Sequence, residues 1–154
     1  MLVSHNTRRH LPHIERPGAA YFVSFSSFGR WTLPSAARDI ALTTIVREHG
    51  VTCWLECGIV MPDHVHLIVQ PYESHSLHGV LQTIKSVSAH RIKATIAAVP
   101  RVWQEESFDR VLRSNESQRI KAEYVVMNPV RKGLCATPDA YPWLWRAWVE
   151  GSPA

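Results

Sequence analysis

The stretch Met61-Pro62-Asp63-His64-Val65-His66-Leu67-Ile68-Val69 places two histidines on either side of one hydrophobic residue, in a run that is otherwise mostly apolar. Its aliphatic and β-branched content is typical of a buried strand. Because side chains alternate between the faces of a strand, His64 and His66 project from one face with their Cβ atoms roughly 6 to 7 Å apart. Two imidazoles at that spacing can converge on one metal ion. The opposite face, which includes Val65 and Val69, is apolar enough to pack in a core.

Length and composition predict a globular domain with a core of its own. The chain has 154 residues, 45% of them hydrophobic, which is enough to bury a core without disulfides or a structural metal. Lys and Arg total 17 against 13 acidic residues, so the net charge of +4 permits an anionic partner without requiring one. We predict one domain over residues 1–154, with a mobile basic lead over 1–13 and a Trp-rich tail over 135–154.

The cysteines and the N-terminal segment bear on the cellular compartment. Cys53 and Cys57 lie in an apolar run and Cys135 follows much later, an odd total of three. We expect reduced core residues that bind no metal. The first 13 residues lack the apolar segment of a signal peptide, and no run approaches the roughly 18 apolar residues of a membrane span. A cytoplasmic protein without membrane contact is expected.

Hydrophobic periodicity predicts the order strand, helix, strand, strand, helix, strand, helix. Pro62-Asp63 separates two apolar runs as a hairpin turn, and Gly50 ends the first helix. The last helix should begin at Ser114 or Asn115 and end near Met127, because Asn128 precedes a proline. The first three strands are expected at 20–25, 51–61 and 64–70, and the segments 102–103 and 108–112 supply the fourth. The helices are expected at about 35–49, 76–96 and 115–127. This order favours an α+β sandwich of the ferredoxin-like type, an antiparallel sheet of about four strands with helices on one face.

The histidine pair alone leaves several interpretations open. Metal-dependent amidohydrolase barrels also carry His-x-His at a strand end, but they need roughly 250 residues. Histidine-triad hydrolases require a third histidine where this chain has Ile68. Both are excluded. Two histidines that bind nothing remain possible on this motif alone.

A second motif is Ala122-Glu123-Tyr124-Val125-Val126-Met127-Asn128-Pro129-Val130-Arg131-Lys132-Gly133-Leu134. Tyr124 and Asn128 are four residues apart and hence neighbours on one helix face. Taken alone, they would be an amphipathic helix residue and a helix terminator. With His64 and His66, they offer a nucleophilic hydroxyl and an amide oxygen beside two imidazoles.

Together these motifs resemble the REP-associated tyrosine transposases, within the single-tyrosine transposases of the His-hydrophobe-His superfamily. The resemblance runs in the family's order from about Arg9 to Trp143, and it includes Trp103-Gln104 and Phe108-Asp109-Arg110-Val111-Leu112-Arg113. It implies a ferredoxin-like or palm-like fold, in agreement with the order above. It also implies a DNA-processing enzyme, which would be nucleoid-associated in the cytoplasm.

The resemblance assigns roles to four residues. His64 and His66 match the family's ligands for Mg²⁺ or Mn²⁺, Asn128 matches the third ligand one turn after the tyrosine, and Tyr124 matches the nucleophile. Asp63 stands where the family often has asparagine. The implied reaction is attack of Tyr124 Oη on single-stranded DNA, giving a 5′-phosphotyrosine and a free 3′-OH, with rejoining by reversal and no ATP. REP-associated members act on DNA hairpins, so hairpin DNA is the implied substrate.

Several points stay open at this stage. A domesticated relative that binds hairpin nucleic acid without cutting, or a nuclease in which a metal-bound water attacks, would carry much of the same sequence. The tail over 141–148 can either pack on the core or stack unpaired bases. The chain can act as a monomer or as a homodimer that exchanges the tyrosine helix, and no protein partner is identifiable. Candidate phosphate contacts are Lys85, Arg91, Lys93, Arg110, Arg113, Arg131 and Lys132.

Overall fold

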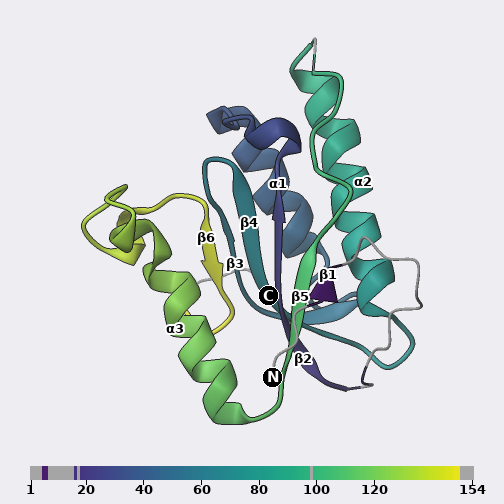
Figure 1. The fold of residues 1–154 in the computed structure, drawn as a ribbon, viewed down its shortest axis with the longest axis vertical. Helices are drawn as coiled ribbons and strands as arrows, with labels where there is room; N and C mark the ends of the chain where they lie inside the picture. Colours follow the sequence, from purple (N-terminus) through teal and green to yellow (C-terminus); the bar gives the residue numbers. More distant parts are fainter. Residues whose placement is uncertain (1–4, 7–15, 17, 98, 150–154) are drawn as a thin grey trace.

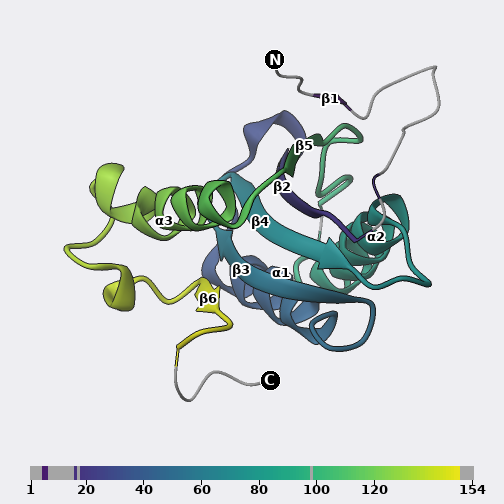
Figure 2. The same cartoon turned by 90° about the horizontal axis from the view of Figure 1, so that it is seen from below.

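The computed structural model describes residues 5–6, 16, 18–97 and 99–149. Its strands form one six-stranded antiparallel sheet, and helices pack on both faces of this sheet (Figures 1 and 2). The strands are β1 (His5–Asn6), β2 (Ala20–Ser26), β3 (Cys53–Val60), β4 (His64–Pro71), β5 (Phe108–Leu112) and β6 (Leu144–Arg146). The helices are α1 (Ser35–Arg47), α2 (Leu77–Thr95) and α3 (Asn115–Arg131), with 3-10 turns at Phe28–Arg30 and Pro138–Ala140.

The ferredoxin-like prediction is confirmed by the middle of the sheet. The strand order is β1-β5-β2-β4-β3-β6, and its four central strands, together with α1 and α2, form the βαββαβ unit expected from the sequence. Both edge strands are additions: β1 pairs with β5, and β6 pairs with β3. The predicted hairpin is present, since β3 and β4 are joined through Met61-Pro62-Asp63 and pair in antiparallel register.

The helices lie on both faces of the sheet, where the sequence analysis expected one face. α1 and α2 cover the side that Val65, Leu67 and Val69 of β4 enter. α3 covers the other side, where Ile68 of β4 and Val125 of α3 share a second core cluster, as Figure 2 shows with the sheet seen near its edge. The second face is apolar enough to bury a helix because β3 directs Cys57 and Ile59 into it.

The predicted end of the last helix was wrong. α3 continues through Asn128 and Pro129 to Arg131. A proline removes one helical donor and disfavours helical geometry in the residue before it. Here both Asn128 and Pro129 are buried, so tertiary packing offsets that local cost. The consequence is functional, because Asn128 stays on the helix face that carries Tyr124.

The tail packs on the sheet. Leu144–Arg146 extend it as β6, Trp145 is buried, and the buried Tyr141 hydroxyl donates to the Val60 carbonyl oxygen at 2.7 Å. Trp148 stays about half exposed.

Cys53 and Cys57 are buried and free in β3, as predicted, and burial raises the pKa of the Cys53 thiol to about 12. The sequence analysis expected a mobile lead over residues 1–13. Apart from His5–Asn6, these residues lie outside the part of the chain that the structure describes. No helix among the described residues is long and apolar enough to cross a membrane.

Candidate active site

The histidine pair lies on the face of the sheet that α3 covers. β4 alternates its side chains as the sequence predicts, and the His64 and His66 ring centroids are 4.7 Å apart. His66 is largely buried and stacks on Phe22 of β2, with ring centroids 5.3 Å apart. His64 keeps more solvent contact. The two imidazoles therefore lie side by side, one buried and one partly exposed.

Asp63 fixes the orientation of His64. Its Oδ1 lies 2.8 Å from His64 Nδ1, and its Oδ2 accepts from Arg30 Nε at 3.1 Å. Burial raises the pKa of this carboxyl, but the hydrogen bonds with His64 and Arg30 outweigh burial and lower the pKa overall. A carboxylate that accepts from Nδ1–H leaves Nε2 with a free lone pair, the arrangement seen in carboxylate–histidine–metal sites.

His66 is held neutral. Burial lowers the pKa of its imidazole to about 3, helped by the nearby charges of His64, Lys121, Arg131 and Lys132. Its Nδ1 is buried and has no hydrogen-bond partner. A neutral imidazole with an unpartnered nitrogen is the form that binds metals.

Tyr124 reaches the histidines within one chain. Its ring centroid lies 6.4 Å from that of His66, although the two residues come from different elements. The tyrosine is 45% exposed, so the side chain is not enclosed by the fold. Two cations flank the ring: Lys121 Nζ lies 4.8 Å and Arg131 Cζ 4.1 Å from its centroid.

Asn128 lies one helical turn beyond Tyr124 and is buried. Its Oδ1 accepts from Arg131 Nη2 at 3.1 Å, and its Nδ2 is buried without a partner. Among the described residues, no group of three His, Cys, Asp or Glu side chains could hold a metal ion. A divalent cation at the histidine pair would therefore need an amide ligand or water as well. The unpartnered His66 Nδ1 fits that requirement, whereas the unpartnered Asn128 atom is the amide nitrogen and the amide oxygen accepts from Arg131.

Comparison with known proteins identifies the family to which the chain belongs. A model of the family described as "Transposase IS200 like" matches residues 41–126, more than half of the chain. The match spans His64, His66 and Tyr124. The chain belongs to the IS200-like transposase family. A search of curated proteins found no match.

One solved structure shares the fold. A REP-associated tyrosine transposase bound to a REP hairpin superposes with a TM-score of 0.69 at 18% identity, covering 88% of this chain and 81% of that one. A proposed transposase from Deinococcus radiodurans R1 has a TM-score of 0.47 at 19% identity, covering 79% of this chain and 97% of that one.

This IS200-like transposase separates the basic residues that the sequence analysis grouped together. Lys85, Arg91 and Lys93 belong to α2, on the face opposite the histidines. The Lys85 ammonium donates to the Glu105 carbonyl oxygen and to Ser107 Oγ, each at 3.1 Å, and burial lowers its pKa to about 8. These three side chains do not line the candidate active site.

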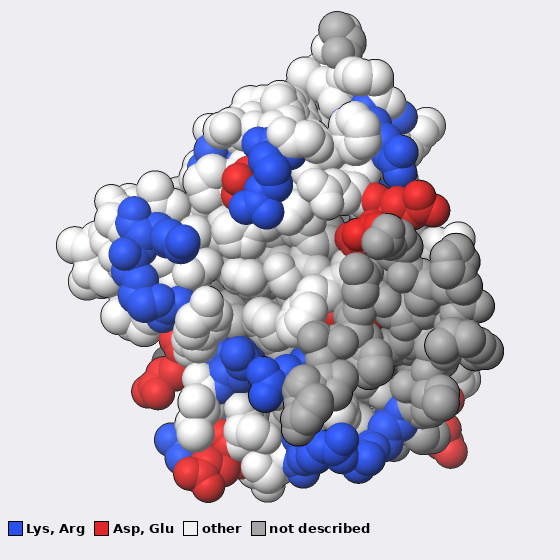
Figure 3. Space-filling model, viewed as in Figure 1, with Lys and Arg blue, Asp and Glu red and all other residues white. Residues whose placement is uncertain are grey.

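Arg110, Arg131 and Lys132 lie closer to the site. Arg110 pairs across the sheet with Phe22, and its charge acts on Lys121. Lys132 follows α3 directly, after Arg131. In Figure 3, lysine and arginine side chains gather over α3. Basic side chains therefore lie on the face of the sheet that carries the histidines.

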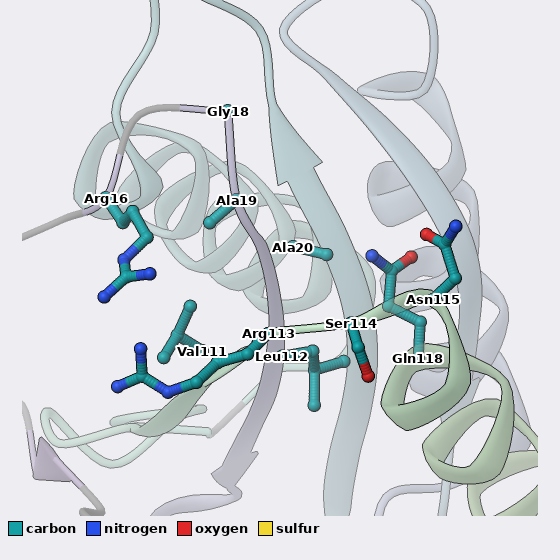
Figure 4. Close-up of a pocket in the computed structure, with 10 residues that line it drawn as sticks. All are labelled: Arg16, Gly18, Ala19, Ala20, Val111, Leu112, Arg113, Ser114, Asn115 and Gln118. Atoms are coloured by element: carbon teal, nitrogen blue, oxygen red, sulfur yellow. The ribbon is translucent and has the colours of Figure 1, made fainter.

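Arg113 lines a separate cavity of about 460 Å³ at the start of α3. Figure 4 shows the Arg16 and Arg113 guanidinium groups on one side of this cavity and the Asn115 and Gln118 side chains on the other. The cavity lies at the helix end remote from Asn128, so the structure does not join Arg113 to the histidine pair.

Sequence reasoning missed two residues of the site. Lys121 precedes Tyr124 by three positions, a spacing that places both on one helix face and could have revealed it. Phe22 carries no such signal, because its stacking on His66 depends on the register between β2 and β4.

Proposed function

We propose that this chain is a single-tyrosine DNA strand transferase that acts on single-stranded DNA through a 5′-phosphotyrosine intermediate. The observation that carries the proposal is the 6.4 Å between the His66 and Tyr124 rings within one chain. Family membership supports a DNA-processing role. We assign Tyr124 as the nucleophile and His64, His66 and Asn128 as the residues that would hold Mg²⁺ or Mn²⁺.

In the proposed reaction, Tyr124 Oη forms a bond to phosphorus while the bond from phosphorus to the 3′ oxygen breaks. The phenol loses its proton, and the departing oxygen takes one up as the free 3′-OH. Because a phosphodiester is exchanged for a phosphodiester, a second 3′-OH can reverse the step on another strand. A bound divalent cation would supply charge neutralisation at the scissile phosphate.

The chain's own residues prepare the nucleophile. A phenol with an ordinary pKa of about 10 is mostly protonated at neutral pH. The Lys121 and Arg131 cations beside the ring make a site in which negative charge on Tyr124 and on the phosphate is stabilised. The rigid α3 helix fixes the position of the hydroxyl group relative to β4.

We propose hairpin DNA of the REP type as the substrate. The fold shared with a transposase that was solved bound to a REP hairpin supports this choice. For DNA contacts we propose Arg110, Arg131 and Lys132 first, because they lie on the histidine side of the sheet. Lys85, Arg91, Lys93 and Arg113 would contact only parts of the DNA that extend beyond the site.

The test is formation of a covalent adduct on a single-stranded hairpin in the presence of Mn²⁺. Wild-type protein should form an adduct that survives denaturing electrophoresis, and chelation by EDTA should prevent it. Tyr124→Phe should reduce adduct formation by at least about 10³-fold, because it removes the hydroxyl group proposed to form the bond to phosphorus. Tyr72→Phe is the matched control, since Tyr72 is also exposed but follows the far end of β4.

The alternatives predict different results. A hydrolytic nuclease would keep cutting in Tyr124→Phe and would show no phosphotyrosine. A protein that only binds hairpins would retain affinity and form no adduct with any divalent metal. An adduct of normal yield in Tyr124→Phe would refute the assignment of the nucleophile.

A further inference from the structure

Arg131 contacts both α3 residues on which the proposed site depends. Its Nη2 donates to Asn128 Oδ1 at 3.1 Å and to the backbone carbonyl oxygen of Tyr124 at 2.9 Å. Its guanidinium carbon also lies 4.1 Å from the centroid of the Tyr124 ring. One side chain therefore holds the proposed nucleophile and the proposed amide ligand at the same time.

These contacts fix which way the Asn128 amide faces. A guanidinium can only donate hydrogen bonds, so the amide must turn Oδ1 toward it. Nδ2 then faces into the protein, where it is buried without a partner. A cation binds the oxygen of an amide, not its NH₂ group. This contact uses one of the two lone pairs of the amide oxygen, and a cation bound to the other would lie beside the positive guanidinium.

We infer that Arg131 is a positioning residue that competes with a divalent cation for Asn128 Oδ1. This inference rests on the proposed function, because it takes Asn128 as the third ligand. Repulsion between the two positive charges favours release of Oδ1 by the guanidinium when a cation binds, and the amide oxygen then faces the metal.

Mn²⁺ binding without DNA tests the competition. Titration followed by electron paramagnetic resonance of free Mn²⁺ gives the affinity of wild type, Arg131→Ala, Asn128→Ala and the double variant. Lys132→Ala is the matched control, because it removes one nearby positive charge but no hydrogen bond to Asn128. Arg131→Ala should tighten Mn²⁺ binding about tenfold more than Lys132→Ala does, as expected for release from one charged hydrogen bond. In the Asn128→Ala background, the two substitutions should have equal effects.

Three results would overturn the inference. They are equal tightening by Arg131→Ala with and without Asn128, no tightening beyond that of Lys132→Ala, and no Mn²⁺ binding by either wild type or Arg131→Ala. Because Asn128 is buried, its variant can fail to fold, and a second measurement on wild-type protein avoids that risk. The Arg131 Nε–H resonance should shift during Mg²⁺ titration, and an unchanged resonance at saturation would contradict the competition.

Neither measurement uses DNA, so the inference and the proposed function can fail separately. An adduct formed normally by wild type, together with an Arg131→Ala affinity equal to that of the control, would leave the strand transferase standing and remove only the role of Arg131. Mn²⁺ affinities as predicted, with no adduct formed by wild type, would support the role of Arg131 and remove the strand transferase proposal.

Discussion

At the scale of single residues, the candidate site contains two buried polar side chains that each keep an atom without a hydrogen-bond partner. His66 stacks on Phe22 and keeps an unpartnered nitrogen, and Asn128 keeps an unpartnered NH₂ group. Buried polar atoms without partners destabilise a fold. Both atoms lie on the side of the sheet that carries Tyr124. Such a loss of stability is typical of functional sites.

His66 should make the stability of the metal-free protein depend on pH. Its pKa is about 3 in the folded chain, against an ordinary value of 6.5 for histidine. The unfolded chain therefore binds more protons between these values, so stability is complete above pH 6.5 and is lost as the pH falls toward 3. Between pH 7 and pH 4, this group should remove about 3 kcal/mol of unfolding free energy.

Urea unfolding in EDTA measures the effect. His66→Gln should lose less stability over the same pH range than wild type does, by about 3 kcal/mol. The difference between the two proteins cancels the other titrating groups. If both proteins lose stability equally, His66 is not held neutral by the fold.

The site residues differ in how far sequence can predict them. His64, His66, Tyr124 and Asn128 follow from two local motifs, because strand alternation and helical spacing fix which residues share a face. The Arg131 contacts follow from side-chain packing along α3, and the separation of Lys85 from the site follows from the face on which α2 packs. Neither is encoded in a local pattern.

At the scale of elements, α3 is the part that converts the fold into a site. It begins at Asn115 with Ser114 as its N-cap, in a reciprocal capping arrangement with Ser117. It then runs past Pro129 and carries Tyr124 and Asn128 over the sheet. The sequence predicted the start of α3 because caps are local, but it misplaced the end because burial of Asn128 and Pro129 is a tertiary effect.

Removal of the N-cap should weaken α3 without altering the site. Ser114→Ala should lower the unfolding free energy by about 1 kcal/mol, because the backbone N–H of Ser117 loses its acceptor. Ser86→Ala, in an exposed position within α2, should change stability by less than about 0.5 kcal/mol. Urea denaturation measures both values. An unchanged stability in Ser114→Ala would show that the cap contributes nothing to holding α3.

At the scale of the whole molecule, the βαββαβ core presents the histidines, and α3 brings the tyrosine to them in the same chain. The order of elements was predictable because each repeats its hydrophobic period over many residues. The placement of α3 on the second face was not, since its helical pattern does not specify which face of the sheet it covers. That placement brings Tyr124 beside the histidines of the same chain.

Mixing two defective chains tests this central claim. His64→Ala/His66→Ala keeps the tyrosine, and Tyr124→Phe keeps the histidines, so each is expected to form no adduct alone. A site built within one chain predicts that an equimolar mixture, incubated with Mn²⁺ and hairpin DNA, also forms no adduct, while wild-type protein does. Adduct formation in the mixture would mean that histidines and tyrosine come from different chains, and it would contradict the account.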